Sequence, residues 1–381
     1  MIDMKSYLKA VNFSGHPFNT FDADKEKNLK KFVTLPPYFE SILGVVDDPQ
    51  PFLVLGMRGL GKTTLKCMLK DKLEKDYERI MIVDYNSYPF TRVKELNEVT
   101  LKDHLLEVNK LIAKQIYQKI MVDNSLCKKF KAKDKEALFH ILEIYLDEEE
   151  KEEIYPVLMS FFEKIFKKYP KQKGRAFYLL PETDELQVVS KGIFTFDQCK
   201  RIVNILGYTG CYIFIDRLDE TNRTDKEPEK AGNLLGPLIS NLEIVQNGFF
   251  SFKFFVPAES IPNLKKMGFR NDKIQNQLIT WTNDKLAEVL RKRVMAFNPE
   301  GKMLGKLGSI CAEEIKDHVD QFVVQKSLSS PRNMLRFCNA IFAEHIESAQ
   351  DFDEKISKKT IATALKKYEY SLKVDQYIAD E

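Results

Sequence analysis

The chain has 381 residues, of which 44% are hydrophobic and 30% are charged, a composition typical of a globular protein with a sizeable core. The formal net charge is only +3, so composition alone does not argue for a nucleic-acid partner. No apolar run approaches the length that spans a bilayer, and the first residues lack the hydrophobic stretch of a secretory leader. Six cysteines without a C-x-x-C pair argue against a disulfide framework and against a zinc site. We therefore expect a cytoplasmic protein without a membrane partner.

Residues 1–50 precede the first predicted strand and form a lead-in. Pro36 and Pro37 predict a short helix that carries Tyr38 and Phe39, since proline is favoured in the first helical turn. This segment either packs on a ligand of the core or covers a sheet edge, and the sequence leaves both interpretations open.

The strongest motif follows the apolar run at residues 51–55, which predicts a buried strand. The glycine-rich sequence GMRGLGKTT comes next, and apolar residues at helical spacing come after it. This order of strand, loop and helix is the context of the phosphate-binding pattern G-x-x-x-x-G-K-[ST], and it argues against an accidental glycine turn. The predicted phosphate-binding residues are Gly56, Arg58, Gly59, Leu60, Gly61, Lys62, Thr63 and Thr64.

The residue types in this loop suit a triphosphate. Glycine lets the backbone approach phosphate oxygens that a Cβ would obstruct, and the N–H groups of the loop and helix N-terminus then point at the phosphates. Lys62 is predicted to place its ammonium on the β- and γ-phosphates, and Thr63 to offer its hydroxyl to Mg²⁺. A GTPase would also need a guanine-reading N-K-x-D sequence, which the chain lacks.

After a second predicted strand at residues 79–85, the chain is helical in pattern and strongly charged from about residue 93 to 194. This region contains an acidic run at residues 147–150 and a basic stretch at residues 164–175. The basic stretch could contact nucleic acid or another acidic partner, although charge runs are more often solvated helix faces or loops.

The second chemical motif is GCYIFIDRLDE, an apolar strand at residues 210–215 that ends in Asp216, Asp219 and Glu220. Carboxylates at the end of a buried strand need a positive partner, and Mg²⁺ held by Thr63 and a nucleotide would be one. Asp216 is predicted to bind this ion directly or through water. Glu220 is the first choice, and Asp219 the second, for the residue that polarises the attacking water. The alternative is a strand that ends in an acidic, solvated turn.

A further strand is predicted at residues 252–256, and the remaining chain is helical in pattern. One helix starts after a capping sequence at residues 282–284. Another starts at Pro331, which leaves Arg332 near a helix N-terminus, where the helix dipole disfavours a cation. A nearby γ-phosphate would remove this conflict. A solvated arginine is the alternative.

Four features together resemble the AAA+/STAND branch of P-loop ATPases: GMRGLGKTT, IFIDRLDE, the strand FKFFVP and the helix SPRNMLRF. The second is similar to the corresponding motif of NACHT-type and KAP-type ATPases, and the C-terminal helices resemble the lid of bacterial origin-recognition-like AAA+ proteins. The resemblance covers most of residues 50–370 and implies a P-loop NTPase of the α/β class. The implied fold is a parallel five-stranded sheet with a large helical insert and a C-terminal helical lid. The corresponding parts are the lead-in at 1–50, the core at 51–262 with its insert at about 93–194, and the lid at 263–381.

The resemblance also implies ATP and Mg²⁺ as cofactors, and it implies roles for several residues. Arg332 matches the sensor 2 arginine of the lid, and Arg270 or Arg293 could be a charge-stabilising finger, in cis or across a subunit boundary. Because proline occupies the usual sensor 1 position, Glu259 or Ser260 would have to serve there. The lead-in would pack on the adenine.

The implied activity is an ATPase that acts as a nucleotide-gated switch, controlling its own homo-oligomeric assembly or a separate effector protein. By family analogy we expect it in prokaryotic anti-phage defence. The alternative is a DNA-binding AAA+ loader or remodeller that uses the basic stretch, with salt-sensitive binding lost on neutralising Lys167, Lys168, Lys171 and Lys173. A scaffold that binds nucleotide without turnover is a third interpretation, and the acidic pair Asp219 and Glu220 argues against it.

Overall fold

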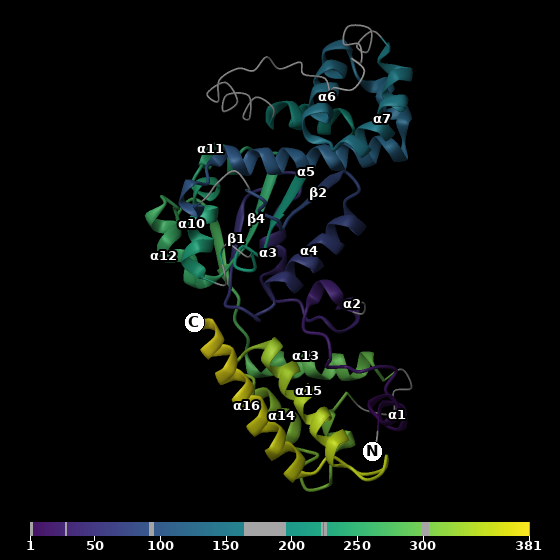
Figure 1. The fold of residues 1–381 in the computed structure, drawn as a ribbon, viewed down its shortest axis with the longest axis vertical. Helices are drawn as coiled ribbons and strands as arrows, with labels where there is room; N and C mark the ends of the chain where they lie inside the picture. Colours follow the sequence, from purple (N-terminus) through teal and green to yellow (C-terminus); the bar gives the residue numbers. More distant parts are fainter. Residues whose placement is uncertain are drawn as a thin grey trace. The chain divides into compact units, whose positions relative to one another are not determined.

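The computed structural model describes residues 3–26, 29–90, 95–163, 196–221, 224, 227–298 and 305–380. The chain is α/β, with a five-stranded, all-parallel sheet of strand order β2-β3-β4-β1-β5 and many helices (Figure 1). The strands are β1 (Phe52–Leu55), β2 (Ile80–Tyr85), β3 (Gly210–Ile215), β4 (Phe250–Val256) and β5 (Gln275–Leu278). The predicted α/β class and the predicted parallel five-stranded sheet are confirmed. The basic stretch at residues 164–175 lies outside the described residues.

The chain divides into two compact units, each made of segments that are distant in sequence. Unit 1 comprises residues 1–40, 54–69 and 277–381, and unit 2 comprises residues 41–53 and 70–276. The predicted boundaries at residues 50 and 262 stay predictions. The longer helices are α1 (Met4–Ala10), α4 (Lys62–Asp76), α5 (Leu101–Val122), α6 (Ala132–Tyr145), α7 (Glu148–Phe161), α10 (Pro228–Ile239), α12 (Ile261–Lys266), α13 (Asn283–Ala296), α14 (Val319–Lys326), α15 (Pro331–Ser348) and α16 (Lys358–Asp380). Shorter α-helices are α2 (Leu29–Phe32), α3 (Phe39–Leu43) and α11 (Leu242–Val245), and the 3-10 helices are η1 (Ala23–Lys25), η2 (Leu96–Glu98), η3 (Asn124–Lys129), η4 (Ala258–Ser260) and η5 (Leu307–Ile310).

In unit 2 the central strands are buried along their whole length. β2 pairs with β3 from Ile80 opposite Gly210 to Tyr85 opposite Ile215, and β4 continues the ladder on the other side of β3. Every residue of β3 and β4 is buried, as continuous apolar runs in a parallel sheet predict. The sequence patterns identified four of the strands and missed β5, because its polar and mostly exposed residues show no apolar periodicity.

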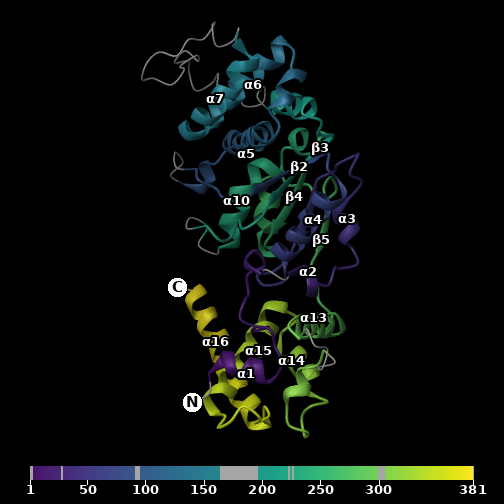
Figure 2. The same ribbon diagram turned by 90° about the vertical axis from the view of Figure 1, so that its right-hand side faces the viewer.

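The insert of unit 2 is built on α5. The helical pattern predicted for this region is confirmed over α5, where Leu105, Val108, Ile112 and Ile116 are buried and Leu101 is half-buried. Helices α6 and α7 pack on α5, on the side away from the sheet (Figures 1 and 2). The acidic run at residues 147–150 forms the capped first turn of α7, a position that the helix dipole favours.

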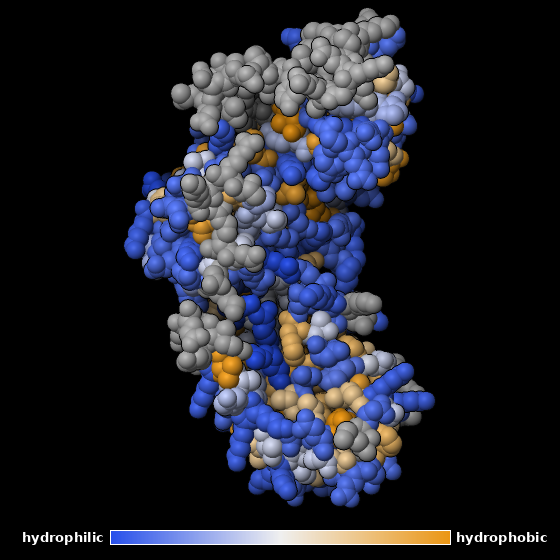
Figure 3. All heavy atoms as spheres, in the orientation of Figure 1, coloured by the Kyte–Doolittle hydropathy of each residue, from blue (hydrophilic) through white to orange (hydrophobic). Residues whose placement is uncertain are grey.

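Unit 1 has its own core, built mainly from α13, α14, α15 and α16 with aromatic residues of the first segment. Tyr7 and Phe18 both pack against Phe342, with ring centroids 6.2 and 5.4 Å away. Thr282 caps α13 by accepting a hydrogen bond from the Lys285 N–H, which confirms the capping prediction. Hydrophilic residues dominate the described part of the face in Figure 3. Among the described residues, no helix combines the length and apolar character that crossing a bilayer requires.

A lysine lies inside the sheet core of unit 2. Lys253, in the middle of β4, is only 1% exposed, and burial lowers its pKa to about 7. Its ammonium lies 3.0 Å from the Gln50 carbonyl oxygen and over the rings of Tyr212 and Phe52, at 5.2 and 5.9 Å from their centroids. The carbonyl and the ring faces partly offset the cost of burying this cation.

Candidate functional site

The glycine loop has the predicted context. It runs from Gly56 to Gly61 between the buried strand β1 and helix α4, whose first residue is Lys62. Thr63 and Thr64 therefore lie in the first helical turn, where backbone N–H groups have no intrahelical acceptor. These donors and the helix dipole make the start of α4 suited to an anion.

Two glycines of the loop adopt a backbone conformation that other residues rarely take. Gly59 has φ of +83° and Gly61 has φ of +93°, both in the left-handed region. A Cβ added at Gly59 would lie 3.1 Å from Arg332 Cβ and 3.2 Å from Ser330 Oγ. The loop therefore needs glycine at this position for two reasons, namely backbone angle and space.

Replacing Gly59 with alanine should destabilise the protein more than replacing Gly207 with alanine. Both changes force alanine into the left-handed region, which costs about 1–2 kcal/mol. Only Gly59 has close neighbours, since nothing lies within 4 Å of a Cβ at Gly207 (φ +99°). The melting temperatures of the two variants test this difference, and equal losses would contradict the packing argument.

Lys62 folds back onto the loop. Its ammonium donates to the Gly56 carbonyl oxygen at 2.8 Å and lies 3.4 Å from the Met57 carbonyl oxygen, and the residue is 8% exposed. The lysine ammonium thus lies against carbonyl oxygens at the start of the loop. Of the other predicted loop residues, Arg58 is exposed, whereas Leu60 and Thr64 are half-buried.

The C-terminal helices of unit 1 contact the same loop. The Trp281 indole N–H donates to the Leu60 carbonyl oxygen at 2.9 Å. At the start of α15, the Arg332 backbone N–H and the Ser330 hydroxyl each lie 3.4 Å from the Gly59 carbonyl oxygen. Arg332, predicted from its place at a helix N-terminus, is therefore next to the glycine loop.

An apolar pocket of about 120 Å³ opens beside these contacts, wholly within unit 1. Its lining comprises Leu29 and residues 32–38 of the lead-in, Leu60 and Gly61 of the loop, the first two turns of α4, the segment 279–281, one side of α13 and the start of α15. Phe32, Tyr38 and Trp281 supply aromatic surface to it. The lead-in thus lines this pocket, and its two interpretations, packing on a ligand and covering a sheet edge, both stay predictions.

The predicted acidic residues lie at the end of β3 in unit 2. Asp216 is 1% exposed and Asp219 is 8% exposed, whereas Glu220 is exposed and lies 3.7 Å from the Arg217 guanidinium. Arg217 has φ of +62°, an uncommon backbone angle for a residue with a side chain. The turn thus directs Glu220 outward while it keeps the two aspartates buried.

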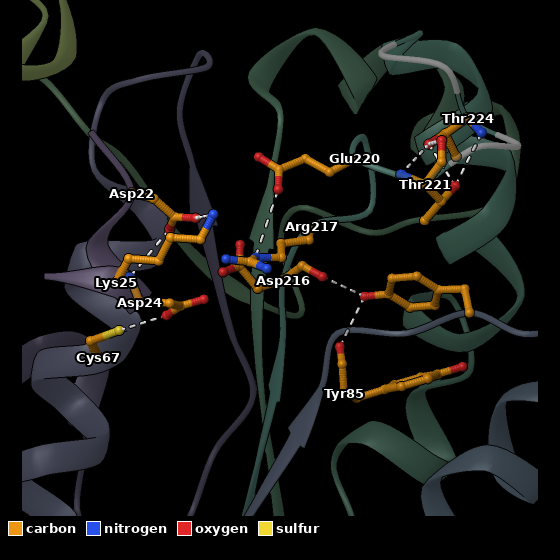
Figure 4. A network of polar contacts seen from close by, with 11 residues as sticks. Asp22, Asp24, Lys25, Cys67, Tyr85, Asp216, Arg217, Glu220, Thr221 and Thr224 are labelled. Carbon is orange, nitrogen blue, oxygen red and sulfur yellow. Dashed lines mark hydrogen bonds and ion pairs between the residues drawn. The ribbon is translucent and has the colours of Figure 1, made fainter. Parts of the chain in front are cut away.

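A tyrosine orients the end of this strand. The Tyr88 hydroxyl lies 2.7 Å from the Asp216 carbonyl oxygen and 3.0 Å from that of Tyr85 (Figure 4). Burial, and then the charges of Asp216 and Asp219, raise the pKa of Tyr88 well above its usual value, so the hydroxyl remains a donor.

The same network continues to a buried histidine. The Nε2 of His104 lies 2.7 Å from the Leu234 carbonyl oxygen, so this nitrogen carries the proton and Nδ1 accepts from the Tyr85 hydroxyl at 2.9 Å. Burial lowers the pKa of His104 to about 4, which keeps the ring neutral at pH 7. The histidine acts as a structural link between β2, α5 and α10.

The two predicted finger arginines have different environments. Arg270 is exposed and pairs with Asp272, with a nitrogen–oxygen distance of 2.9 Å. Arg293 is 4% exposed, forms an ion pair with Glu26 and donates to the Thr20 carbonyl oxygen at 3.3 Å. Arg293 therefore ties the first segment to α13, and its buried position disfavours a role across a subunit boundary.

At the predicted sensor 1 position, which follows β4, the Ser260 side chain is buried and the Glu259 side chain is exposed.

Sequence patterns did not identify Trp281, Tyr88 and Ser330 as parts of these sites. Trp281 is the only tryptophan in the chain, which was a signal for an unusual position. Tyr88 and Ser330 act through contacts with Asp216 and Gly59, which are far away in the chain, so no local pattern could identify them.

No protein-family profile and no curated protein sequence matches the chain.

Proposed function

We propose that the chain binds Mg-ATP at the glycine loop and hydrolyses it, as an ATPase of the AAA+/STAND type. The observation that carries the proposal is the geometry of the loop. Left-handed glycines lead into the start of α4, where an anion would be favoured, and the Lys62 ammonium lies 2.8 Å from the Gly56 carbonyl oxygen of the same loop. A phosphate oxygen would replace this carbonyl as the partner of Lys62.

The apolar pocket supports a nucleotide over a simple anion. Phe32, Tyr38 and Trp281 offer a surface for the flat face of a base, and the pocket reaches Gly61 of the loop and Thr64 of α4. We propose that the lead-in packs on the adenine there. Arg332, which contacts Gly59 through its backbone, would place its guanidinium near the γ-phosphate.

The acidic residues after β3 fit the metal and water roles of the same reaction. β1 and β3 belong to one parallel sheet, and ligands of such sheets bind outside the carboxyl ends of the strands. Thr63 and Asp216 would hold Mg²⁺, which would neutralise charge on the phosphates. Glu220, or Asp219 in its place, would accept a proton from the attacking water. Arg270 remains a candidate finger.

The nucleotide would act as a switch. Because the C-terminal helices of unit 1 contact the loop through Trp281, Ser330 and Arg332, a bound γ-phosphate would change their contacts. Such a change could control homo-oligomer assembly or a separate effector. A role in prokaryotic defence and a cytoplasmic location are parts of this proposal that rest on family analogy.

The single tryptophan provides a direct test. Mg-ATP should change Trp281 emission in a saturable manner, because the indole N–H is bonded to the loop that would rearrange. The Lys62→Ala variant should lose this saturable change. Calorimetric titration of the same proteins provides an independent measure of binding. Unchanged emission together with no heat of binding would contradict the proposal.

A further inference from the structure

The helical insert carries a second charged feature that the predicted activity does not use. Five lysines lie between residues 128 and 135, at the turn from η3 into α6: Lys128, Lys129, Lys131, Lys133 and Lys135. The first four are exposed. Lys135 is part of the packing, because it donates to the Phe161 carbonyl oxygen at 2.8 Å and lies over the ring of Phe162.

Two of these lysines line an open cavity of about 430 Å³ within unit 2. The second wall of the cavity is a helix at residues 196–205. The lining comprises Lys129, Lys131, Asp134, Asp197, Lys200, Arg201, Asn204 and Ile205. Four cations and two carboxylates line the cavity, so its formal charge is positive.

One of the two carboxylates is already used to orient an arginine. Asp134 has a side chain only 5% exposed, and its carboxylate lies 2.6 Å from Arg201 Nε. The Arg201 side chain is itself 63% exposed. The ion pair therefore fixes the Arg201 guanidinium through its Nε. The two terminal nitrogens of the guanidinium remain as hydrogen-bond donors at the rim of the cavity.

The acidic and basic runs of the insert differ in how they are neutralised. In the acidic run, Glu150 lies 2.9 Å from Lys114, and Glu148 lies 2.9 Å from Lys151. The four exposed lysines at 128–133 differ from the acidic run. Among the residues that the structure describes, no carboxylate lies within ion-pair distance of any of them. Three of the four carboxylates of the acidic run are thus paired with lysines, whereas the exposed lysines at 128–133 have no ion-pair partner in the described part of the chain.

We propose that this cavity and its lysines bind the phosphodiester backbone of duplex nucleic acid. The cavity has one apolar lining residue, Ile205, whereas protein–protein interfaces have an apolar core and protein–DNA interfaces are polar and positively charged. No aromatic side chain lines it, so bases of a single strand have nothing to stack on. Lysines and an oriented arginine are the residue types that contact phosphates without reading sequence.

This inference goes beyond the proposed ATPase activity and does not depend on it, because the residues belong to the insert and none belongs to the glycine loop. It also differs from the sequence-based alternative, which used the stretch 164–175.

The test is fluorescence anisotropy of a labelled duplex without nucleotide, at salt concentrations from 50 to 200 mM. With about four phosphate contacts, the affinity should fall by roughly 10²-fold over this range. The double variant Lys129→Gln/Lys131→Gln should lower the slope of log affinity against log salt by about two units. Lys62→Ala should bind the duplex like the unchanged protein, so this assay and the nucleotide assays can fail independently.

The matched control is Lys358→Gln/Lys359→Gln, which removes the same charge from exposed positions at the start of α16. It should leave the slope unchanged, and melting temperatures should show that both double variants are folded. Absence of duplex binding at 50 mM salt, or an equal effect of both double variants, would overturn the proposal. The proposal would also be overturned if a single strand bound more tightly than the duplex. The same holds if polyglutamate displaced the labelled duplex as well as unlabelled duplex of the same total charge.

Discussion

Replacing Glu220 with glutamine should lower the kcat of ATP hydrolysis by about 10²–10⁴-fold, the usual contribution of a general base. The amide keeps the size of the side chain but cannot accept the proton of the attacking water. Glu220 is the exposed carboxylate of the turn, and the Arg217 guanidinium lies 3.7 Å from it. ATP binding should persist, because Lys62 and the loop are unchanged.

Two further variants separate the roles of the other residues. Lys62→Ala should weaken ATP binding by at least about 10–100-fold, because it removes hydrogen bonds from a charged donor. Asp219→Asn is the matched change at the second candidate base, which is 8% exposed. If Asp219→Asn loses turnover and Glu220→Gln does not, the two residues exchange roles.

The Glu220→Gln variant also tests the switch. Trapped with Mg-ATP, it should rise in solution mass to a defined oligomer, measured by light scattering, and Lys62→Ala should not. An unchanged monomer would contradict assembly control and leave a separate effector as the target. Turnover by Glu220→Gln equal to that of the unchanged protein would reject Glu220 as the base.

Replacing Lys253 with methionine should stabilise the protein at neutral pH. Lys253 is buried in β4, and its pKa is lowered from 10.5 to about 7 because burial disfavours the charged form. At pH 7 and below, folding must bury an ammonium that the unfolded chain exposes to water. Methionine has similar length and flexibility and removes this cost.

The sign of the pH dependence follows from the two pKa values. Between pH 7 and 10.5 the unfolded chain binds a proton at this lysine and the folded chain does not, so the free energy of unfolding rises with pH. The slope is about 1.4 kcal/mol per pH unit within this window. The advantage of Lys253→Met should therefore be largest at pH 7 or below and shrink by several kcal/mol towards pH 10.

Urea unfolding of both proteins from pH 6 to 9.5 measures this difference, and other titrating groups cancel in the comparison. Lys75→Met is the control, because the Lys75 side chain is 60% exposed on α4. Its effect should be small and independent of pH. A pH-independent difference at Lys253 would show that its pKa is the same in the folded and the unfolded protein, and it would contradict the lowered pKa.

Local patterns predicted much of the fold because their causes are local. The run at 210–215 is apolar throughout, as a strand buried on both faces requires. The Thr282 side chain caps α13 by accepting from the N–H of Lys285, only three residues further along the chain. The glycine loop was identifiable for the same reason, since the left-handed angles of Gly59 and Gly61 exclude most other residues.

Long-range contacts decided the rest. β5 carries polar residues, so only its place at the edge of the sheet makes it a strand. Lys253 lies in an apolar strand, and its burial beside Tyr212 and Gln50 depends on segments that are distant in sequence. A pattern in one segment contains no information about which other segment will cover it.

The candidate site shows the same division. Residue types and spacing within one segment specified which groups could hold phosphate and metal, because phosphate contact demands glycine, lysine and a hydroxyl at fixed positions along a turn. Tertiary structure decided that Trp281 and α15 contact this turn and that Tyr88 orients Asp216. These contacts join residues far apart in the chain, so the chemistry of any one segment does not encode them.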